Sequence, residues 1–213
     1  EVLLQHPGVL VITDDIYEHL IYGDVEFTTL AQVEPRLKER TLTCNGMSKA
    51  YCMTGWRIGF AGGPESLIRA MAKLQSQSSF HPASICQHAA VAGLNGGRDF
   101  LVPQLRAYHE RRDTLVLELN RIDGIVCPVP DGAFYVFPSC TGLFGRLTPD
   151  GQTLASDTDV VGYFLDTAGV ALVPGRAFGF PGHFRVSYAT DIDTLLSACE
   201  RIQLACEKLI ETS

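Results

Sequence analysis

Short apolar runs rich in β-branched residues, separated by segments with helical periodicity, constrain the fold of this chain most strongly. Three such runs lie in the first half, at residues 9–13 (VLVIT), 40–44 (RTLTC) and 56–61 (WRIGFA). The first is typical of a strand buried on both faces of a parallel sheet. Helices are expected from Pro64 to about residue 76, over 84–94 and over 98–119. This alternation of strand and helix predicts an α/β sheet domain.

The second half has a different pattern, typical of an α+β domain. It predicts strands at 125–126, 133–137, 170–173 and 183–188, a long surface loop over 138–156, a helix over 159–168, and a closing helix over 191–209 capped by Asp191. The helix over 98–119 is expected to bridge the halves. We therefore predict a partial large domain over 1–105 and a small C-terminal domain over 106–213.

Composition and charge exclude several classes of protein. Hydrophobic residues make up 46% of the 213 residues and charged residues only 19%, which argues against a disordered chain or a coiled coil. The net charge of -7 argues against binding to a bare nucleic-acid backbone. There is no apolar run of about 18 residues to cross a membrane and no signal-peptide pattern. Seven cysteines without a CxxC pair indicate buried thiols in a reducing, cytoplasmic compartment.

Lys49 differs from the other three lysines of the chain in its surroundings. Its neighbours over residues 46–55 (GMSKAYCMTG) are neutral and follow a predicted buried strand. A lysine at a strand end, in low dielectric and near a cation, has its pKa lowered from about 10.4 and can form an imine. A lysine that lies along a sheet edge with its ammonium in solvent is the structural alternative.

Asp14 and Asp15 follow the first predicted strand, where open α/β sheets bind ligands. A carboxylate there could hold a cationic ring nitrogen, and the Tyr17 hydroxyl could contact the same ligand. The structural alternative is a helix cap.

Arg57 and Arg185 each lie between apolar residues, and a buried arginine needs an anionic partner. Phosphate suits Arg57, with the Ser48 hydroxyl nearby, and a substrate carboxylate suits Arg185. A structural salt bridge is the alternative for both. Together, an imine-forming lysine, a carboxylate, a phenol and a phosphate-binding arginine are the set that pyridoxal phosphate (PLP) requires.

Residues 45–59 (NGMSKAYCMTGWRIG) closely resemble the lysine signature of class I aminotransferases of fold type I. Residues 14–20 (DDIYEHL) resemble the Asp-x-x-Tyr segment of that family, and residues 132–137 (GAFYVF), 173–175 (VPG) and 184–190 (FRVSYAT) resemble blocks of its small domain. The chain is most similar to the C-terminal portion of bacterial aspartate aminotransferases, a group that includes prephenate-using relatives.

This resemblance implies a role for each candidate residue. Lys49 would form the imine bond with PLP and later carry the proton between the substrate and the cofactor. Asp14 would pair with the pyridinium nitrogen, and Tyr17 would donate a hydrogen bond to the phenolic oxygen of the ring. The remaining roles are phosphate binding by Ser48 and Arg57, and binding of the substrate carboxylate by Arg185.

The resemblance also implies that the N-terminal half of the family's fold lies upstream of Glu1. We therefore expect an isolated chain either to dimerise or swap segments to cover its sheet, or to keep only part of the fold. His81 departs from the small polar residue of close relatives, which puts contacts there in doubt.

The predicted function is PLP-dependent transamination between an amino acid, aspartate or glutamate, and a 2-oxo acid, in a cytoplasmic homodimer. A prephenate or aromatic aminotransferase is a close alternative. An aminotransferase-like sensor domain of a transcription regulator and an inert fragment are two others.

Overall fold

The computed structural model describes residues 1–211, which divide into two compact units. Unit 1 comprises Glu1–Pro103, and unit 2 begins at Gln104. The division falls inside helix α5 (Leu101–Leu119).

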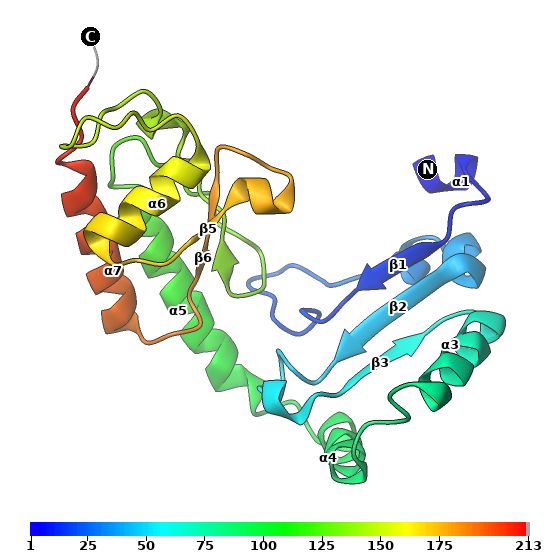
Figure 1. Cartoon of the computed structure of the whole chain (residues 1–213). Coiled ribbons are helices and arrows are strands. Elements are labelled where there is room, and N and C mark those ends of the chain that lie inside the picture. The colour runs from blue at the N-terminus through cyan, green and yellow to red at the C-terminus, as the bar shows by residue number, and fades with distance from the viewer. Residues whose placement is uncertain (212–213) are drawn as a thin grey trace. The chain divides into compact units, whose positions relative to one another are not determined.

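Unit 1 contains a three-stranded sheet in the order β1-β2-β3, which Figure 1 shows side by side. Its strands are β1 (Val11–Asp14), β2 (Thr41–Gly46) and β3 (Gly59–Gly62). β1 runs parallel to β2 with Asp14 opposite Cys44, whereas β3 runs antiparallel to β2. The helices of unit 1 are α1 (Val2–Gln5), α2 (Leu30–Val33), η1 (Pro35–Arg40), η2 (Thr54–Trp56), α3 (Glu65–Gln77) and α4 (Ser84–Asn95).

The first strand differs from the expectation that both of its faces would be buried. No residue of β1 is buried, and Ile12 is 72% exposed. The reason is that β1 forms an edge of a small sheet, and within residues 1–211 nothing covers the Ile12 side chain. The strand expected over 56–61 also begins later, because η2 and a left-handed residue, Arg57, precede β3.

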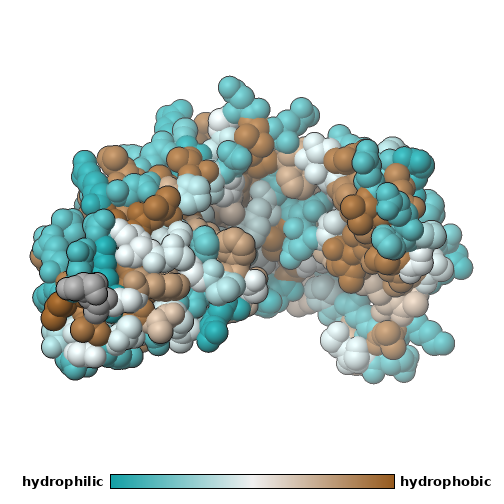
Figure 2. All heavy atoms as spheres, turned by 90° about the horizontal axis from the view of Figure 1, so that it is seen from above, coloured by the Kyte–Doolittle hydropathy of each residue, from teal (hydrophilic) through white to brown (hydrophobic). Residues whose placement is uncertain are grey.

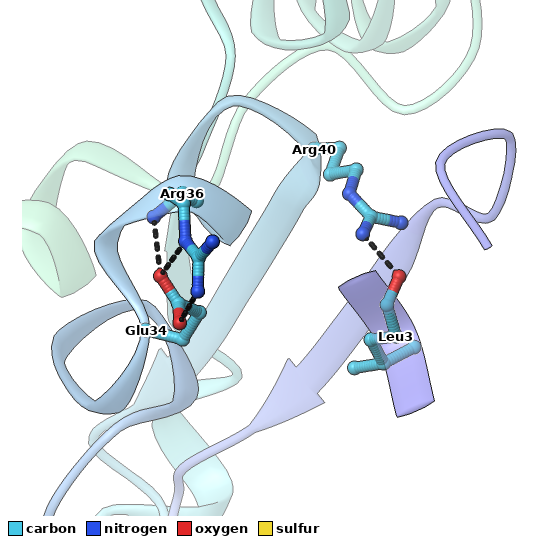
Figure 3. A network of polar contacts seen from close by, with 4 residues as sticks. All are labelled: Leu3, Glu34, Arg36 and Arg40. Carbon is cyan, nitrogen blue, oxygen red and sulfur yellow. Dashed lines mark hydrogen bonds and ion pairs between the residues drawn. The ribbon is translucent and has the colours of Figure 1, made fainter. Parts of the chain in front are cut away.

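Arg40 ties the N-terminal segment to the sheet. Its guanidinium donates hydrogen bonds to the backbone oxygens of His6 (2.8 Å) and Val9 (2.7 Å) and also to that of Leu3, as Figure 3 shows for Leu3. Nearby, Glu34 accepts from the Arg36 side chain at 2.7 and 2.8 Å (Figure 3). Arg40 therefore fixes the N-terminal segment, whereas the Glu34–Arg36 pair closes the start of η1.

Unit 2 contains a second three-stranded sheet, antiparallel and in the order β4-β6-β5. Its elements after α5 are β4 (Tyr135–Val136), η3 (Thr141–Leu143), α6 (Asp157–Ala168), β5 (Val173–Pro174), η4 (Gly175–Phe178), β6 (Phe184–Ser187) and α7 (Ile192–Cys206). Phe164, Phe184, Tyr188 and Ile202 form part of a fully buried core.

Local capping signals place both long helices of the second half. The Ser156 hydroxyl accepts from the Asp159 N–H (3.3 Å) at the start of α6. The Asp191 carboxylate accepts from the Thr194 N–H (2.8 Å) at the start of α7, as the sequence predicts. Each cap satisfies a backbone donor that the helix leaves unpaired.

The segment 138–156 was expected to be a surface loop. Its backbone is irregular apart from the short η3, as expected, but its expected place on the surface is wrong. Cys140, Leu143 and Leu154 are fully buried, and Leu147 bridges to Thr153. The glycines, prolines and hydroxyl residues that indicated a loop are present, but the apolar residues between them pack into the core of unit 2.

The seven cysteines are unpaired, and four of them (Cys127, Cys140, Cys199 and Cys206) are buried in unit 2. Burial raises the pKa of Cys127, Cys140 and Cys206 to about 12 and that of Cys199 to about 11. Such thiols behave as small apolar side chains.

Apolar residues also reach the surface in several patches, which Figure 2 shows in brown. Within residues 1–211, no helix combines the length and the apolar character needed to cross a membrane.

Candidate active site

Three segments of unit 1 meet at one edge of its sheet, the edge formed by the ends of the strands and not by an outer strand. The carboxyl ends of β1 and β2 share this edge because the two strands are parallel. β3 begins at the same edge because it is antiparallel, with Gly59 opposite Gly46. Asp14, Lys49 and Arg57 come from the ends of these strands or from the turns directly beyond them. Strand topology therefore gathers a carboxylate, an amine and a guanidinium at one edge.

The segment that contains Lys49, residues 46–58, is held by backbone hydrogen bonds within the segment and by a buried side chain. The Met47 N–H donates to the Ile58 oxygen (3.3 Å), and the Met53 N–H donates to the Met47 oxygen (3.2 Å). Met47 is fully buried, and helix α4 approaches it so closely that a Cβ on Gly93 would lie 2.7 Å from the Met47 Cε. The backbone that carries Lys49 is thus supported by a buried side chain.

Lys49 and Tyr17 lie close together. The Lys49 Nζ is 5.8 Å from the centroid of the Tyr17 ring, within the range of a cation–π interaction. Tyr17 belongs to the turn after β1, in which the Leu20 N–H donates to the backbone carbonyl oxygen of Tyr17 (2.8 Å). Both side chains are half-buried.

Asp14 is exposed at the last position of β1, and its carboxylate accepts weakly from the Ile16 N–H (3.3 Å). Closing a local turn is the kind of structural role that the sequence left open for this residue. Within the described part of the chain, no cationic side chain forms an ion pair with it. The carboxylate therefore retains the capacity to bind a cationic group.

Arg57 lies in a strained turn rather than in a buried strand. It is exposed, its φ is 52°, and it donates from Nη1 to the Thr54 oxygen (2.9 Å). Cys52, in the same segment, also has a positive φ of 53°. Non-glycine residues in this region each cost about 1–3 kcal/mol and cluster at functional sites. No carboxylate in residues 1–211 pairs with Arg57, and the half-buried Ser48 makes no hydrogen bond there through its hydroxyl.

Arg185 belongs to unit 2, on the central strand β6. Its Cζ lies 4.6 Å from the centroid of the Tyr135 ring and 4.8 Å from that of the Phe178 ring. No carboxylate among residues 1–211 forms a salt bridge with it, so the structural alternative is not observed. Two aromatic rings hold the guanidinium, and its N–H groups keep the capacity to bind an anion.

Sequence reasoning missed a polar cluster beside the lysine segment. The Asn45 side chain donates to Glu18 Oε1 (2.8 Å), and His19 Nε2 lies 3.3 Å from the same oxygen. Burial lowers the pKa of His19, Glu18 opposes this, and Arg98 adds to it. These residues lie inside the quoted motifs, but no spacing in the sequence links Glu18 to Asn45.

This cluster lines a cavity of about 640 Å³ together with Asp15 and Arg98. None of the five unit 1 candidates, Asp14, Tyr17, Ser48, Lys49 and Arg57, lines that cavity. The candidates lie at the strand ends, whereas Thr43, Asn45 and Phe60 of the cavity wall lie along β2 and β3.

Residues 1–202 match the family model described as aminotransferase class I and II. The chain belongs to this family. The resemblance read from the lysine signature is thereby confirmed, as is the α/β class of the fold.

Relatives of the aminotransferase family have high sequence identity to the chain. An aspartate aminotransferase of Rhizobium meliloti (strain 1021) is 54% identical over 209 residues, which are 98% of this chain and 51% of the relative. An aspartate/prephenate aminotransferase of Cereibacter sphaeroides is 51% identical over 98% of the chain and 52% of the relative. The chain thus spans about half the length of the curated relatives it matches, as expected for a C-terminal portion.

Solved aminotransferases have the same fold. The crystal structure of an aspartate aminotransferase from Rhizobium meliloti matches with a TM-score of 0.95 at 54% identity, covering 98% of this chain and 52% of that one. An aromatic aminotransferase from Pyrococcus horikoshii matches with a TM-score of 0.85 at 34% identity, covering 97% of this chain and 53% of that one.

Membership of the aminotransferase family implies PLP as cofactor. The donor set at the sheet edge fits this group chemically. Lys49 provides an amine, Asp14 a carboxylate without an internal cationic partner, and Tyr17 a phenol. Ser48 and Arg57 provide a hydroxyl and a guanidinium without a carboxylate partner in residues 1–211, which suits a phosphate.

Proposed function

We propose that the chain is part of a PLP-dependent aminotransferase and that Lys49 is its catalytic residue. The family match over residues 1–202 carries this proposal. The gathering of Lys49, Asp14 and Arg57 at one sheet edge supports it. When bound there, PLP supplies an electron sink that stabilises negative charge at the α-carbon of an amino acid.

In this proposal, each candidate residue of unit 1 binds a different group of the cofactor. Lys49 binds it through the ε-amine and moves a proton to and from the substrate α-carbon. Asp14 holds a positive charge on the ring nitrogen, and the Tyr17 hydroxyl donates a hydrogen bond to the ring oxygen. Ser48 and Arg57 bind the phosphate, for which the exposed, strained turn at Arg57 keeps the guanidinium accessible.

Arg185 binds the α-carboxylate of the substrate in this proposal. A guanidinium in contact with two rings loses little further freedom when it binds a carboxylate. The part of the relatives' length that this chain does not span would contribute the rest of the site. Residues 1–105 belong to the large, PLP-binding domain and residues 106–213 to the small one. The family resemblance supports a cytoplasmic homodimer.

The amino donor is aspartate or glutamate and the acceptor a 2-oxo acid. Relatives named aspartate aminotransferase support this assignment. A second candidate substrate is prephenate, because relatives at 51–53% identity are named aspartate/prephenate aminotransferases, one of them as probable.

Reductive trapping tests the assignment of Lys49. The chain is incubated with PLP, treated with sodium borohydride and digested, and the labelled peptide is identified by mass spectrometry. We expect the label on Lys49 at PLP concentrations too low to label Lys38, Lys73 and Lys208. These three lysines serve as internal controls for non-specific labelling.

Two variants sharpen this test. Lys49→Ala is expected to abolish the preferential label, whereas Lys73→Ala, on helix α3, is expected to leave it unchanged. Equal labelling of all four lysines in the unmodified chain would contradict the proposal.

A further inference from the structure

Phe178 reaches Arg185 from outside the sheet, unlike Tyr135. Tyr135 lies on β4, opposite Ser187 of β6, so strand pairing fixes it relative to Arg185. Phe178 lies at the end of η4, after β5 has ended at Pro174. The position of its ring over the guanidinium therefore depends on how the η4 turn is held.

The η4 turn is held at both ends by its backbone. The Gly175 N–H donates to the His183 oxygen (2.7 Å), and the Phe180 N–H donates to the Gly175 oxygen (3.1 Å). Gly179 ends the turn with a φ of 72°, which a residue with a side chain rarely adopts. These bonds leave the Arg176 N–H, at the second position of the short helix, without a backbone acceptor.

Asp157 supplies that acceptor from another element. Its Oδ2 accepts from the Arg176 N–H at 2.7 Å, a charge-assisted hydrogen bond. Asp157 lies in the first turn of α6, where the helix dipole favours a negative charge, and is 1% exposed. Its Oδ1 has no hydrogen-bond partner within the described residues.

We propose that Asp157 is a positioning residue, which fixes the η4 turn so that Phe178 covers one side of the Arg185 guanidinium. A buried carboxylate with one unsatisfied oxygen costs free energy, and α6 does not need it as a cap, because Ser156 caps the helix. What the carboxylate adds is a strong bond to the turn that carries Phe178. The importance of this for substrate binding rests on the proposed role of Arg185.

The position of the Phe178 ring can be measured by NMR without any activity. We expect the ring currents of Tyr135 and Phe178 to shift the Nε–Hε signal of Arg185, which is assigned by its loss in Arg185→Lys, upfield. Phe178→Leu gives the signal expected when one ring is removed. We expect Asp157→Ala to move the signal most of the way to that value, and Asp157→Asn, which keeps an acceptor oxygen, to leave it nearly unchanged.

A double variant separates positioning from general loosening of the fold. If Asp157 acts through Phe178, Asp157→Ala adds no further shift to Phe178→Leu. An additive shift, or an unchanged signal in Asp157→Ala alone, would overturn the proposal.

Arg176→Pro covers the case in which Asp157→Ala does not fold. This variant removes the N–H donor and leaves Asp157 in place. The expected result is the same movement of the Arg185 signal, and an unmoved signal in the folded variant would count against the proposal.

Titration with succinate, a dicarboxylate, separates this inference from the proposed function. Asp157→Ala and Phe178→Leu are expected to weaken succinate binding at Arg185 about threefold to tenfold. If the variants move the Arg185 signal but succinate never perturbs it, the positioning holds and the role of Arg185 fails. If succinate binds but Asp157→Ala changes neither signal nor affinity, the positioning fails and the proposed role stands.

Discussion

Both units of the chain contain a three-stranded sheet, but they bury it very differently. In unit 2, Phe184 on the central strand and Val136 on an edge strand are almost fully buried. In unit 1, Ile12 on β1 is 72% exposed and Phe60 on β3 is 44% exposed. Helix α6 of unit 2 buries five of its residues, whereas α3 of unit 1 buries none. Two sheets with the same number of strands thus differ in how far their apolar side chains are buried.

Within unit 1, the large side chains that are fully buried lie next to candidate residues. Leu20 and Met47 are its fully buried large side chains. Met47 lies directly before Ser48 and Lys49, and Leu20 closes the turn that carries Tyr17. Ser48, Lys49 and Tyr17 are therefore attached to backbone supported by the largest fully buried side chains of a poorly covered unit. Local packing keeps their backbone defined even where the sheet faces are open.

Truncating one phenylalanine in each unit gives the largest expected contrast. Phe164→Ala removes a fully buried ring that packs edge-on against Phe184 at 6.0 Å, and should lower the free energy of unfolding by about 3–5 kcal/mol. Phe60→Ala removes a 44% exposed ring and should cost less than about 1 kcal/mol. Urea unfolding followed by circular dichroism measures both. A large cost for Phe60→Ala would mean that the β3 face is covered in solution, for example by self-association.

The sequence predicted the elements whose signals are local. Pro64 directly before α3, the Asp191 cap of α7 and the β-branched run of β2 lie within a few residues of the structure they specify. The predictions from sequence were wrong where the structure depends on whether another element covers a strand, or on backbone strain. Periodicity cannot say whether another element covers Ile12, and it does not reveal the left-handed conformation of Arg57.

The candidate site divides in the same way. The rule that ligands bind beyond the carboxyl ends of strands led to Asp14 and Tyr17. Neutral neighbours after a predicted strand led to Lys49, and the parallel pairing of β1 with β2 brings the two strand ends together. The bond from Asn45 to Glu18 joins residues 27 positions apart, and the bond from Arg176 to Asp157 joins residues 19 apart. Such pairings depend on strand register and on packing between elements, which cannot be predicted from local patterns in a single sequence.

Two glycine substitutions test the same contrast on a smaller scale. A Cβ on Gly175 of unit 2 would lie 2.8 Å from the backbone oxygen of His183 and would also contact that of Phe180, so Gly175→Ala should cost about 1–3 kcal/mol. A Cβ on Gly93 of unit 1 would meet only the flexible end of Met47 and the Tyr51 ring. The helix propensity of alanine offsets that strain, so Gly93→Ala should change stability by less than about 0.5 kcal/mol. A similar cost for both would mean that unit 1 is as tightly packed as unit 2.

Acid titration gives the smallest expected effect on stability, because it breaks a single ion pair whose arginine is exposed to solvent. The hydrogen bonds from the Arg36 side chain and backbone lower the pKa of Glu34 from 4.5 to about 2. A lowered pKa means that the pair stabilises unit 1 above about pH 4.5 and that this contribution is lost as the pH falls toward 2. Glu34→Gln should therefore reduce the pH dependence of unfolding between pH 2 and 4.5 relative to the unmodified chain. Because the Arg36 side chain is exposed to solvent, the effect should also shrink at high salt. Identical pH profiles for Glu34→Gln and the unmodified chain would show that the Glu34–Arg36 pair in Figure 3 does not stabilise the fold.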